Sequence, residues 1–143
     1  MHEIINNQRK ITIDVKIFDD FLENCFELIK EAENRPAAIA LISDRKMREL
    51  NKQFRGKNYA TDVLSFPFEE PSDSTANQSD FLGDIAISVE TATRQAIEND
   101  LSFETEIKQL ILHGILHLSG YDHETDYGEM NARELELRDI LQI

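Results

Sequence analysis

Two hydrophobic periods along the chain predict a mixture of strands and helices. A strand-like alternation covers residues 11–15, a short apolar run suited to a buried strand covers residues 37–42, and two further strands are expected at residues 63–66 and 84–89. Helical spacing predicts helices over residues 18–33, 44–54, 90–99, 103–118 and 127–141. This alternation indicates one α/β or α+β domain over residues 1–143, with helices packed on one sheet of about four strands.

The segment 103–118 differs from the other expected helices because it is apolar nearly all the way round. Ser102 is a suitable N-cap, and Glu104 and Glu106 suit the positive end of the helix dipole. The following sequence IKQLILHGILHL is typical of a helix in the middle of a domain. In contrast, residues 69–80, EEPSDSTANQSD, are polar and predict a surface loop.

Three of the four histidines lie at the end of this expected central helix, in the pattern H-x3-H-x2-G-x2-H. His113 and His117 are one turn apart, about 40° around the axis, so both rings can reach one ion. Gly120 can end the helix in a left-handed conformation and let the chain return with His123. The pattern predicts one Zn²⁺ ion per chain, although the ligand type alone leaves nickel, copper or iron open.

Two alternatives for this metal site depend on neighbouring residues. A structural zinc needs a fourth protein ligand, and Cys25 is instead expected to be buried, since it lies in a helical apolar pattern. Zinc proteases with this histidine spacing have glutamate directly after the first histidine as general base. Here that position is Gly114, so a protease would need another base, such as Glu106 or Glu129. The spacing is shared with these proteases, but their chemistry is not supported.

The charge of the chain is unevenly distributed. The net charge is −13, which argues against general attraction to nucleic acid. Residues 45–57, however, contain six basic residues and one acid, so this segment carries +5 and the remainder −18. The chain opens without the apolar run of a secretion signal and contains no stretch that could cross a bilayer, so a cytoplasmic protein with no membrane partner is expected.

Four segments resemble one known family. HGILHLSGYDH, residues 113–123, closely resembles the zinc motif of the YbeY family, bacterial endoribonucleases needed for ribosomal RNA maturation. LNKQFRGKNYATDVLSFPF (50–68), LGDIAIS (82–88) and MNARELEL (130–137) are similar to further segments of that family. The resemblance implies a mixed sheet of four strands covered by helices. It also implies metal ligands at His113, His117 and His123 and a functional arginine at Arg55.

The resemblance and the basic segment together predict a single-strand-specific, metal-dependent endoribonuclease acting in ribosomal RNA processing and ribosome quality control, with the ribosome or its proteins as further partners. Arg55 and His117 are the expected catalytic residues. Other expected RNA contacts are Arg45, Lys46, Arg48, Lys52 and Lys57. Asp62 or Asp84 is expected to orient a metal-bound imidazole. The alternatives are a metzincin-like peptidase and a zinc-stabilised ribosome assembly factor without catalysis. Whether water or the ribose 2′-hydroxyl attacks stays open.

Overall fold

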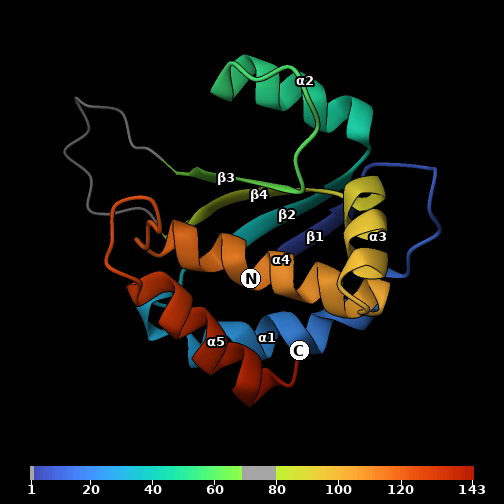
Figure 1. The fold of residues 1–143 in the computed structure, drawn as a ribbon. Coiled ribbons are helices and arrows are strands. Elements are labelled where there is room, and N and C mark those ends of the chain that lie inside the picture. Colours follow the sequence, from blue (N-terminus) through green and yellow to red (C-terminus); the bar gives the residue numbers. More distant parts are fainter. Residues whose placement is uncertain (1, 69–79) are drawn as a thin grey trace.

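A four-stranded mixed sheet lies at the centre of the computed structural model, which describes residues 2–68 and 80–143 (Figure 1). The strand order is β1-β2-β4-β3, in which β1, β2 and β4 are parallel and β3 runs antiparallel to β4. The strands are β1 (Glu3–Asn6), β2 (Ala37–Ile42), β3 (Val63–Pro67) and β4 (Gly83–Ser88). The predicted mixed sheet of four strands is confirmed.

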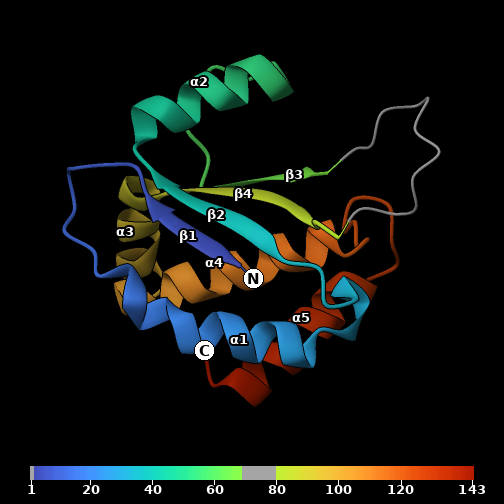
Figure 2. The same cartoon turned by 180° about the vertical axis from the view of Figure 1, so that it is seen from behind.

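Helices cover both faces of this sheet, as the two opposite views show (Figures 1 and 2). The helix that follows β2 lies on one face, and the central helix lies against the other face with the remaining helices around it. The helices are α1 (Asp19–Leu28), α2 (Asp44–Arg55), α3 (Val89–Glu98), α4 (Phe103–Leu118) and α5 (Glu129–Leu141). In the pictures α2 lies alone on its face, whereas α4 lies between the sheet and the pair α1 and α5.

The main core lies between the sheet and α4. Ile107, Ile111 and Ile115 of α4 are fully buried and belong to the same apolar cluster as Ile85 of β4. Ser102 caps this helix by accepting a hydrogen bond from the backbone N–H of Thr105 at 3.1 Å. The predicted central buried helix is therefore confirmed with its bounds. None of the helices in the described residues has the length and apolar character that a bilayer span requires.

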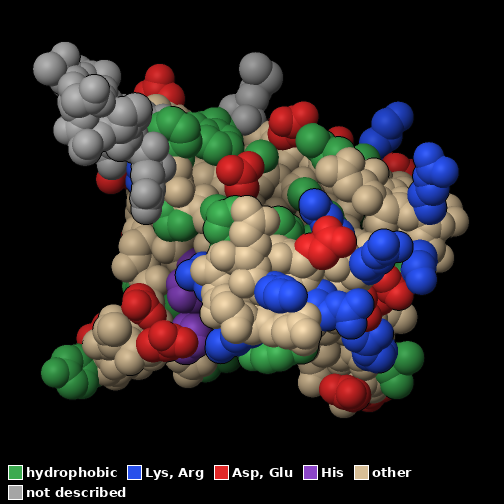
Figure 3. Space-filling view, turned by 90° about the horizontal axis from the view of Figure 1, so that it is seen from above, with side chains coloured by type: hydrophobic (Ala, Val, Ile, Leu, Met, Phe, Trp, Pro, Cys, Tyr) green, Lys and Arg blue, Asp and Glu red, His purple; other side chains and the backbone are tan. Residues whose placement is uncertain are grey.

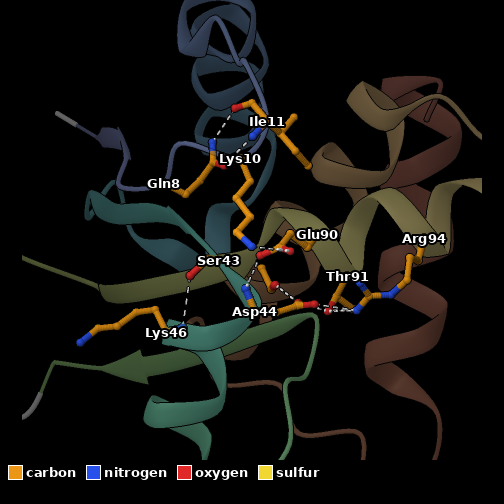
Figure 4. Close-up of polar contacts among 10 residues, drawn as sticks. Gln8, Lys10, Ile11, Ser43, Asp44, Lys46, Glu90, Thr91 and Arg94 are labelled. Carbon is orange, nitrogen blue, oxygen red and sulfur yellow. Dashed lines mark hydrogen bonds and ion pairs between the residues drawn. The ribbon is translucent and has the colours of Figure 1, made fainter.

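A polar cluster fixes α2 against the end of β4 and the start of α3 (Figure 4). The Asp44 carboxylate accepts hydrogen bonds from Ser88 at 2.5 Å, Thr91 at 2.6 Å and Arg94 at 2.9 Å. Burial alone raises the pKa of Asp44, but these three hydrogen bonds outweigh burial and hold the pKa below its ordinary value. The N-cap of α2 is Ser43, whose hydroxyl accepts a hydrogen bond from the backbone N–H of Lys46 at 3.3 Å.

The strand expected over residues 11–15 is wrong. These residues alternate between half-buried and exposed, as a strand would, but they pair with no strand in the described part of the chain. The side-chain amide of Gln8 explains the difference, because it donates to the carbonyl of Ile11 at 2.7 Å and accepts from its N–H at 2.9 Å. The backbone N–H and carbonyl of Ile11 are satisfied by this side chain and not by a neighbouring strand, and the edge strand is β1 instead.

Two smaller differences concern helix lengths. The helix expected over residues 18–33 ends at Leu28 and is followed by a 3₁₀ turn, Lys30–Ala32, which ends at Glu33 with a left-handed φ of 55°. Cys25 is buried as predicted, and burial raises the pKa of its thiol to about 12. The helix expected from residue 127 begins at Glu129. Residues 69–79 of the expected surface loop lie outside the described residues.

Candidate metal centre

The structure brings the three motif histidines together at the C-terminal end of α4. His113 and His117 lie one turn apart on the helix, with ring centroids separated by 4.9 Å. The ring of His123 lies 5.6 Å from the first and 5.2 Å from the second. One ring nitrogen of each residue lies within 4.8 Å of the others, close enough for all three to bind one metal ion. These side chains are half-buried, half-buried and exposed in chain order.

A tight turn after α4 returns His123 to the helix. The chain leaves the helix at Leu118, and Gly120 adopts a φ of 109°, which favours glycine. The N–H of Tyr121 donates to the carbonyl of Leu116 at 3.1 Å, which closes the turn. The predicted role of Gly120 as the left-handed residue at this helix end is confirmed.

An ion pair on the far side of this turn holds it in place. The Tyr121 hydroxyl donates to Oε2 of Glu31 at 2.7 Å. The Arg133 guanidinium of α5 binds the same carboxylate through Nε at 2.8 Å and Nη2 at 3.1 Å. Hydrogen bonds from this guanidinium, against a smaller opposing effect of burial, lower the pKa of Glu31 to about 2. The turn that carries His123 is therefore attached to α5 and to the segment after α1.

A carboxylate of α5 contacts His113 of the candidate metal centre. Oε1 of Glu134 lies 3.0 Å from Nδ1 of His113, and the Glu134 side chain is 10% exposed. Burial raises the pKa of Glu134, but the hydrogen bond and charge of His113, with Arg138 nearby, outweigh burial and keep that pKa below its ordinary value. Because Nδ1 faces a carboxylate acceptor, Nε2 of His113 is the nitrogen left for an ion.

In the described residues, neither of the two acids expected in this orienting role is hydrogen-bonded to a histidine ring of the centre, although Asp62 lines the same cleft. Asp62 accepts a hydrogen bond from the backbone N–H of Val63 at 2.7 Å, at the start of β3. Asp84 lies on β4 with an exposed side chain whose pKa is raised by partial burial. Among the described residues, Glu134 is the carboxylate that is hydrogen-bonded to a ring of the centre. Glu134 was not predicted from the sequence, although it lies between Met130 and Leu137 on the buried stripe of α5, an unusual position for an acid.

The donor set fits a metal ion that keeps an open coordination position. Burial, followed by the neighbouring His113 and His123, lowers the pKa of His117 and favours the neutral imidazole that metals require. In the described residues, the side chains close enough to share this ion are the three histidines alone, without the fourth ligand of a structural zinc site. Three neutral imidazoles suit zinc and also other late transition metals.

Gly114, the departure from the protease pattern, has a structural reason. A Cβ atom at this position would lie 2.9 Å from Cδ1 and 3.0 Å from Cγ2 of Ile85 on β4. Both distances are shorter than an ordinary contact, because α4 lies directly against the sheet here. A glutamate at residue 114 would therefore meet the buried face of the sheet. The other two acids considered as a base, Glu106 and Glu129, are respectively buried and hydrogen-bonded to the N–H of Tyr127.

The histidines line a cleft of about 870 Å³ together with part of the basic segment. Arg55, the last residue of α2, and Lys57 line the same cleft. The Arg55 side chain is exposed, and its Nη2 donates to the carbonyl of Ser65 at 3.3 Å. The remaining basic residues of the segment lie on α2 outside this lining: Arg45, Lys46, Arg48 and Lys52. Figure 3 shows basic side chains over this face of the molecule, with acidic side chains among them and histidine visible beside some of the basic ones.

A second cavity adjoins the candidate metal centre and is more acidic than the cleft. It has a volume of about 520 Å³ and lies beside His113. Its lining includes Glu98, Glu106 and Glu134, with Arg138 as its basic residue. The cavity lining contains four acids against one basic residue, whereas the cleft lining contains three acids (Asp62, Asp122 and Glu124) against Arg55 and Lys57. A phosphate group is therefore repelled more strongly by the cavity than by the cleft.

Comparison with known proteins places this geometry in a family. The family model described as Endoribonuclease YbeY matches residues 3–142. The chain belongs to the YbeY family. Endoribonuclease YbeY of Nautilia profundicola is 52% identical over 99 residues, which are 69% of this chain and 67% of that protein. Endoribonuclease YbeY of Syntrophus aciditrophicus is 35% identical over 138 residues, 94% of this chain and 85% of that one.

A solved structure agrees with this assignment to the YbeY family. The solution structure of a Thermotoga maritima protein matches with a TM-score of 0.66 at 30% identity, covering 99% of this chain and 89% of that one. The family match also includes the N-terminal residues, for which the sequence segments gave no specific signal. The family resemblance and the fold it implies are therefore confirmed.

Proposed function

We propose that this chain is a metal-dependent endoribonuclease that cleaves single-stranded RNA during ribosomal RNA processing. The observation that carries the proposal is the position of Arg55 in the same cleft as the three histidines. A phosphodiester in this cleft lies between a candidate metal centre and a guanidinium. Membership of a family described as Endoribonuclease YbeY supports the same reaction. Because the proposed substrate is ribosomal RNA, we expect the activity in the cytoplasm. Ribosomal proteins are further proposed partners.

The proposed ligands are His113, His117 and His123, holding one zinc ion per chain. When bound, zinc supplies Lewis acidity toward a phosphoryl oxygen and lowers the pKa of water. The chain itself orients the ligands. Glu134 fixes the tautomer of His113, and the hydrogen bond of Tyr121 to Glu31 holds the turn that carries His123.

Arg55 is the proposed phosphate-binding residue. A guanidinium stays charged at any working pH and can donate to two phosphate oxygens at once. Among the described residues, Arg55 donates one hydrogen bond, to the Ser65 carbonyl, which leaves most of its donors for a ligand. In this position Arg55 offsets the negative charge that develops at phosphorus in the transition state. With His117, Arg55 forms the catalytic pair of this proposal.

The remaining basic residues would attract the RNA backbone. Lys57 reaches the cleft, and the basic residues of α2 extend the positive surface away from it. The proposed contacts are Arg45, Lys46, Arg48, Lys52 and Lys57. Such contacts are electrostatic, so binding should weaken steeply as salt rises. A cleft with few basic residues suits a flexible single strand better than a rigid duplex, whose bases are paired and stacked.

The test combines metal analysis with RNA cleavage. Purified protein is assayed on single-stranded and duplex RNA of the same sequence, with and without a chelator, beside the His117→Ala variant. The proposal expects one zinc per chain, cleavage of the single strand, and loss of both in the variant. Casein cleavage without RNA cleavage would favour the peptidase alternative. Full RNA binding by the wild-type protein with no cleavage would favour an assembly factor without catalysis.

A further inference from the structure

Tyr59 is an exposed aromatic residue in the cleft that contains the histidines. Its side chain is 54% exposed and lines the cleft together with Arg55 and Lys57. The nearby exposed ring of Phe54 packs edge-on against Phe66 at 5.1 Å, which accounts for its position. The Tyr59 ring stacks on no other aromatic ring in the part of the chain that the structure describes. The exposed ring is therefore in a position to contact a ligand bound in the cleft.

The loop that carries Tyr59 is held in place by hydrogen bonds at both ends. The side-chain amide of Asn51, which is 2% exposed, donates to the carbonyl of Tyr59 at 2.8 Å. The N–H of Lys57 donates to the carbonyl of the same asparagine at 3.3 Å, and the N–H of Ser88 donates to the carbonyl of Asp62 at 2.9 Å. A ring on a fixed backbone loses little conformational freedom when a ligand binds to it.

Charge decides on which side of the histidines an RNA strand can continue. The cavity beside His113 is lined by four acids and one basic residue, so it repels a phosphate backbone. The cleft is lined by three acids, and its two cations are Arg55 and Lys57, four and two residues before Tyr59 in the chain. A strand with a phosphate at Arg55 therefore extends past Tyr59 rather than into the cavity. Cations beside an exposed aromatic ring form the combination that binds single strands by backbone charge and base stacking.

We propose that Tyr59 stacks on the base of an unpaired nucleotide next to the phosphate bound at Arg55, and thereby selects single-stranded RNA. The inference rests on the proposed ribonuclease function and adds a base-binding subsite to it. A base in a duplex is already covered on both faces by its neighbours. Only an unpaired base can turn toward the ring, and every base has a face that can stack, so the subsite prefers single strands without strict sequence preference.

The test measures cleavage by the metal-loaded full chain on short single-stranded RNAs. Tyr59→Ala should raise KM about tenfold, with kcat and zinc content close to those of the wild type. Tyr59→Phe, which keeps the ring and removes the hydroxyl, should behave like the wild type. Tyr127→Ala is the matched control, because Tyr127 is 99% exposed and lies outside the cleft lining. This variant should leave KM unchanged.

RNA substrates that lack one base test whether the rise in KM comes from stacking. An abasic nucleotide at the stacked position should raise KM of the wild type about tenfold and should have no further effect on Tyr59→Ala. Three results would each overturn the stacking role. They are an unchanged KM for Tyr59→Ala, a rise in KM for Tyr59→Phe as large as that for Tyr59→Ala, and additive effects on KM of Tyr59→Ala and the abasic nucleotide. These results are separate from failure of the proposed function, in which the wild-type protein would not cleave RNA.

Discussion

Nδ1 of His113 lies 3.0 Å from Oε1 of Glu134, so a carboxylate of α5 contacts a ring of α4 at the candidate metal centre. Nη2 of Arg138 lies 3.7 Å from the same oxygen and forms an ion pair with it. The carboxylate keeps the proton on Nδ1, which fixes the tautomer that offers Nε2 to an ion. This contact makes α5 part of the metal centre, although α5 contributes no ligand.

Glu134→Gln is expected to weaken metal binding by about 10-fold to 100-fold. The amide keeps the size of the side chain but removes the negative charge that orients the ring and increases its basicity. Titration against a competing chelator measures the metal Kd. Asp139→Asn removes an exposed acid from the same helix and should leave Kd unchanged. An unchanged Kd for Glu134→Gln would show that the contact only packs α5 against α4.

Arg55→Ala is expected to reduce kcat by about a hundredfold, which corresponds to on the order of 3 kcal/mol of transition-state stabilisation. Zinc content and circular dichroism should stay unchanged, because Arg55 is exposed and is no ligand in the proposal. Arg55→Lys should recover only part of the rate, since an ammonium group cannot bind two oxygens in a fork. A variant with full activity, or one that fails to fold, would remove Arg55 from the proposed mechanism.

The histidine cluster was predictable from the sequence because its geometry is local. Helix periodicity places His113 beside His117, and Gly120 permits the turn that returns His123. Helix α4 was equally clear, since Ser102 gives a capping signal and the apolar run that follows has helical length. Interactions within one helix and one turn require no knowledge of the rest of the fold.

The contacts that support the cluster were not predictable in this way. Glu31 binds Arg133 across 102 positions, and Glu134 contacts His113 across 21 positions. Such pairs are set by how the helices pack, and a single sequence contains no pattern that joins them. Strand β1 was missed because it is a mostly exposed edge strand without apolar alternation. A half-buried loop at residues 11–15 shows that alternation instead.

Gly114→Ala is expected to destabilise the fold by about 1–3 kcal/mol through overpacking. In a free helix alanine is favoured over glycine by about 1 kcal/mol, so a loss would reflect the contact with Ile85 on β4. Urea unfolding measures the change. Ile85→Val removes the Cδ1 atom nearest to the added Cβ, so the double variant should regain part of the lost stability. A stabilised Gly114→Ala would mean that the helix and sheet separate at little cost.

The ion pair of Glu31 with Arg133 predicts a pH dependence of stability. Hydrogen bonds from Arg133 and Tyr121 lower the pKa of Glu31 from 4.5 to about 2. A carboxylate with a lowered folded-state pKa stabilises the fold fully above its unfolded value of 4.5, and this contribution disappears as the pH falls toward 2. Glu31→Gln should therefore be less stable than the wild type at pH 7, with a difference that shrinks through this window. Urea unfolding with chelator in both samples excludes the effect of metal loss, and the exposed Glu27 gives the control Glu27→Gln. A difference between Glu31→Gln and the wild type that stays constant from pH 7 to pH 2 would contradict the assigned ion pair.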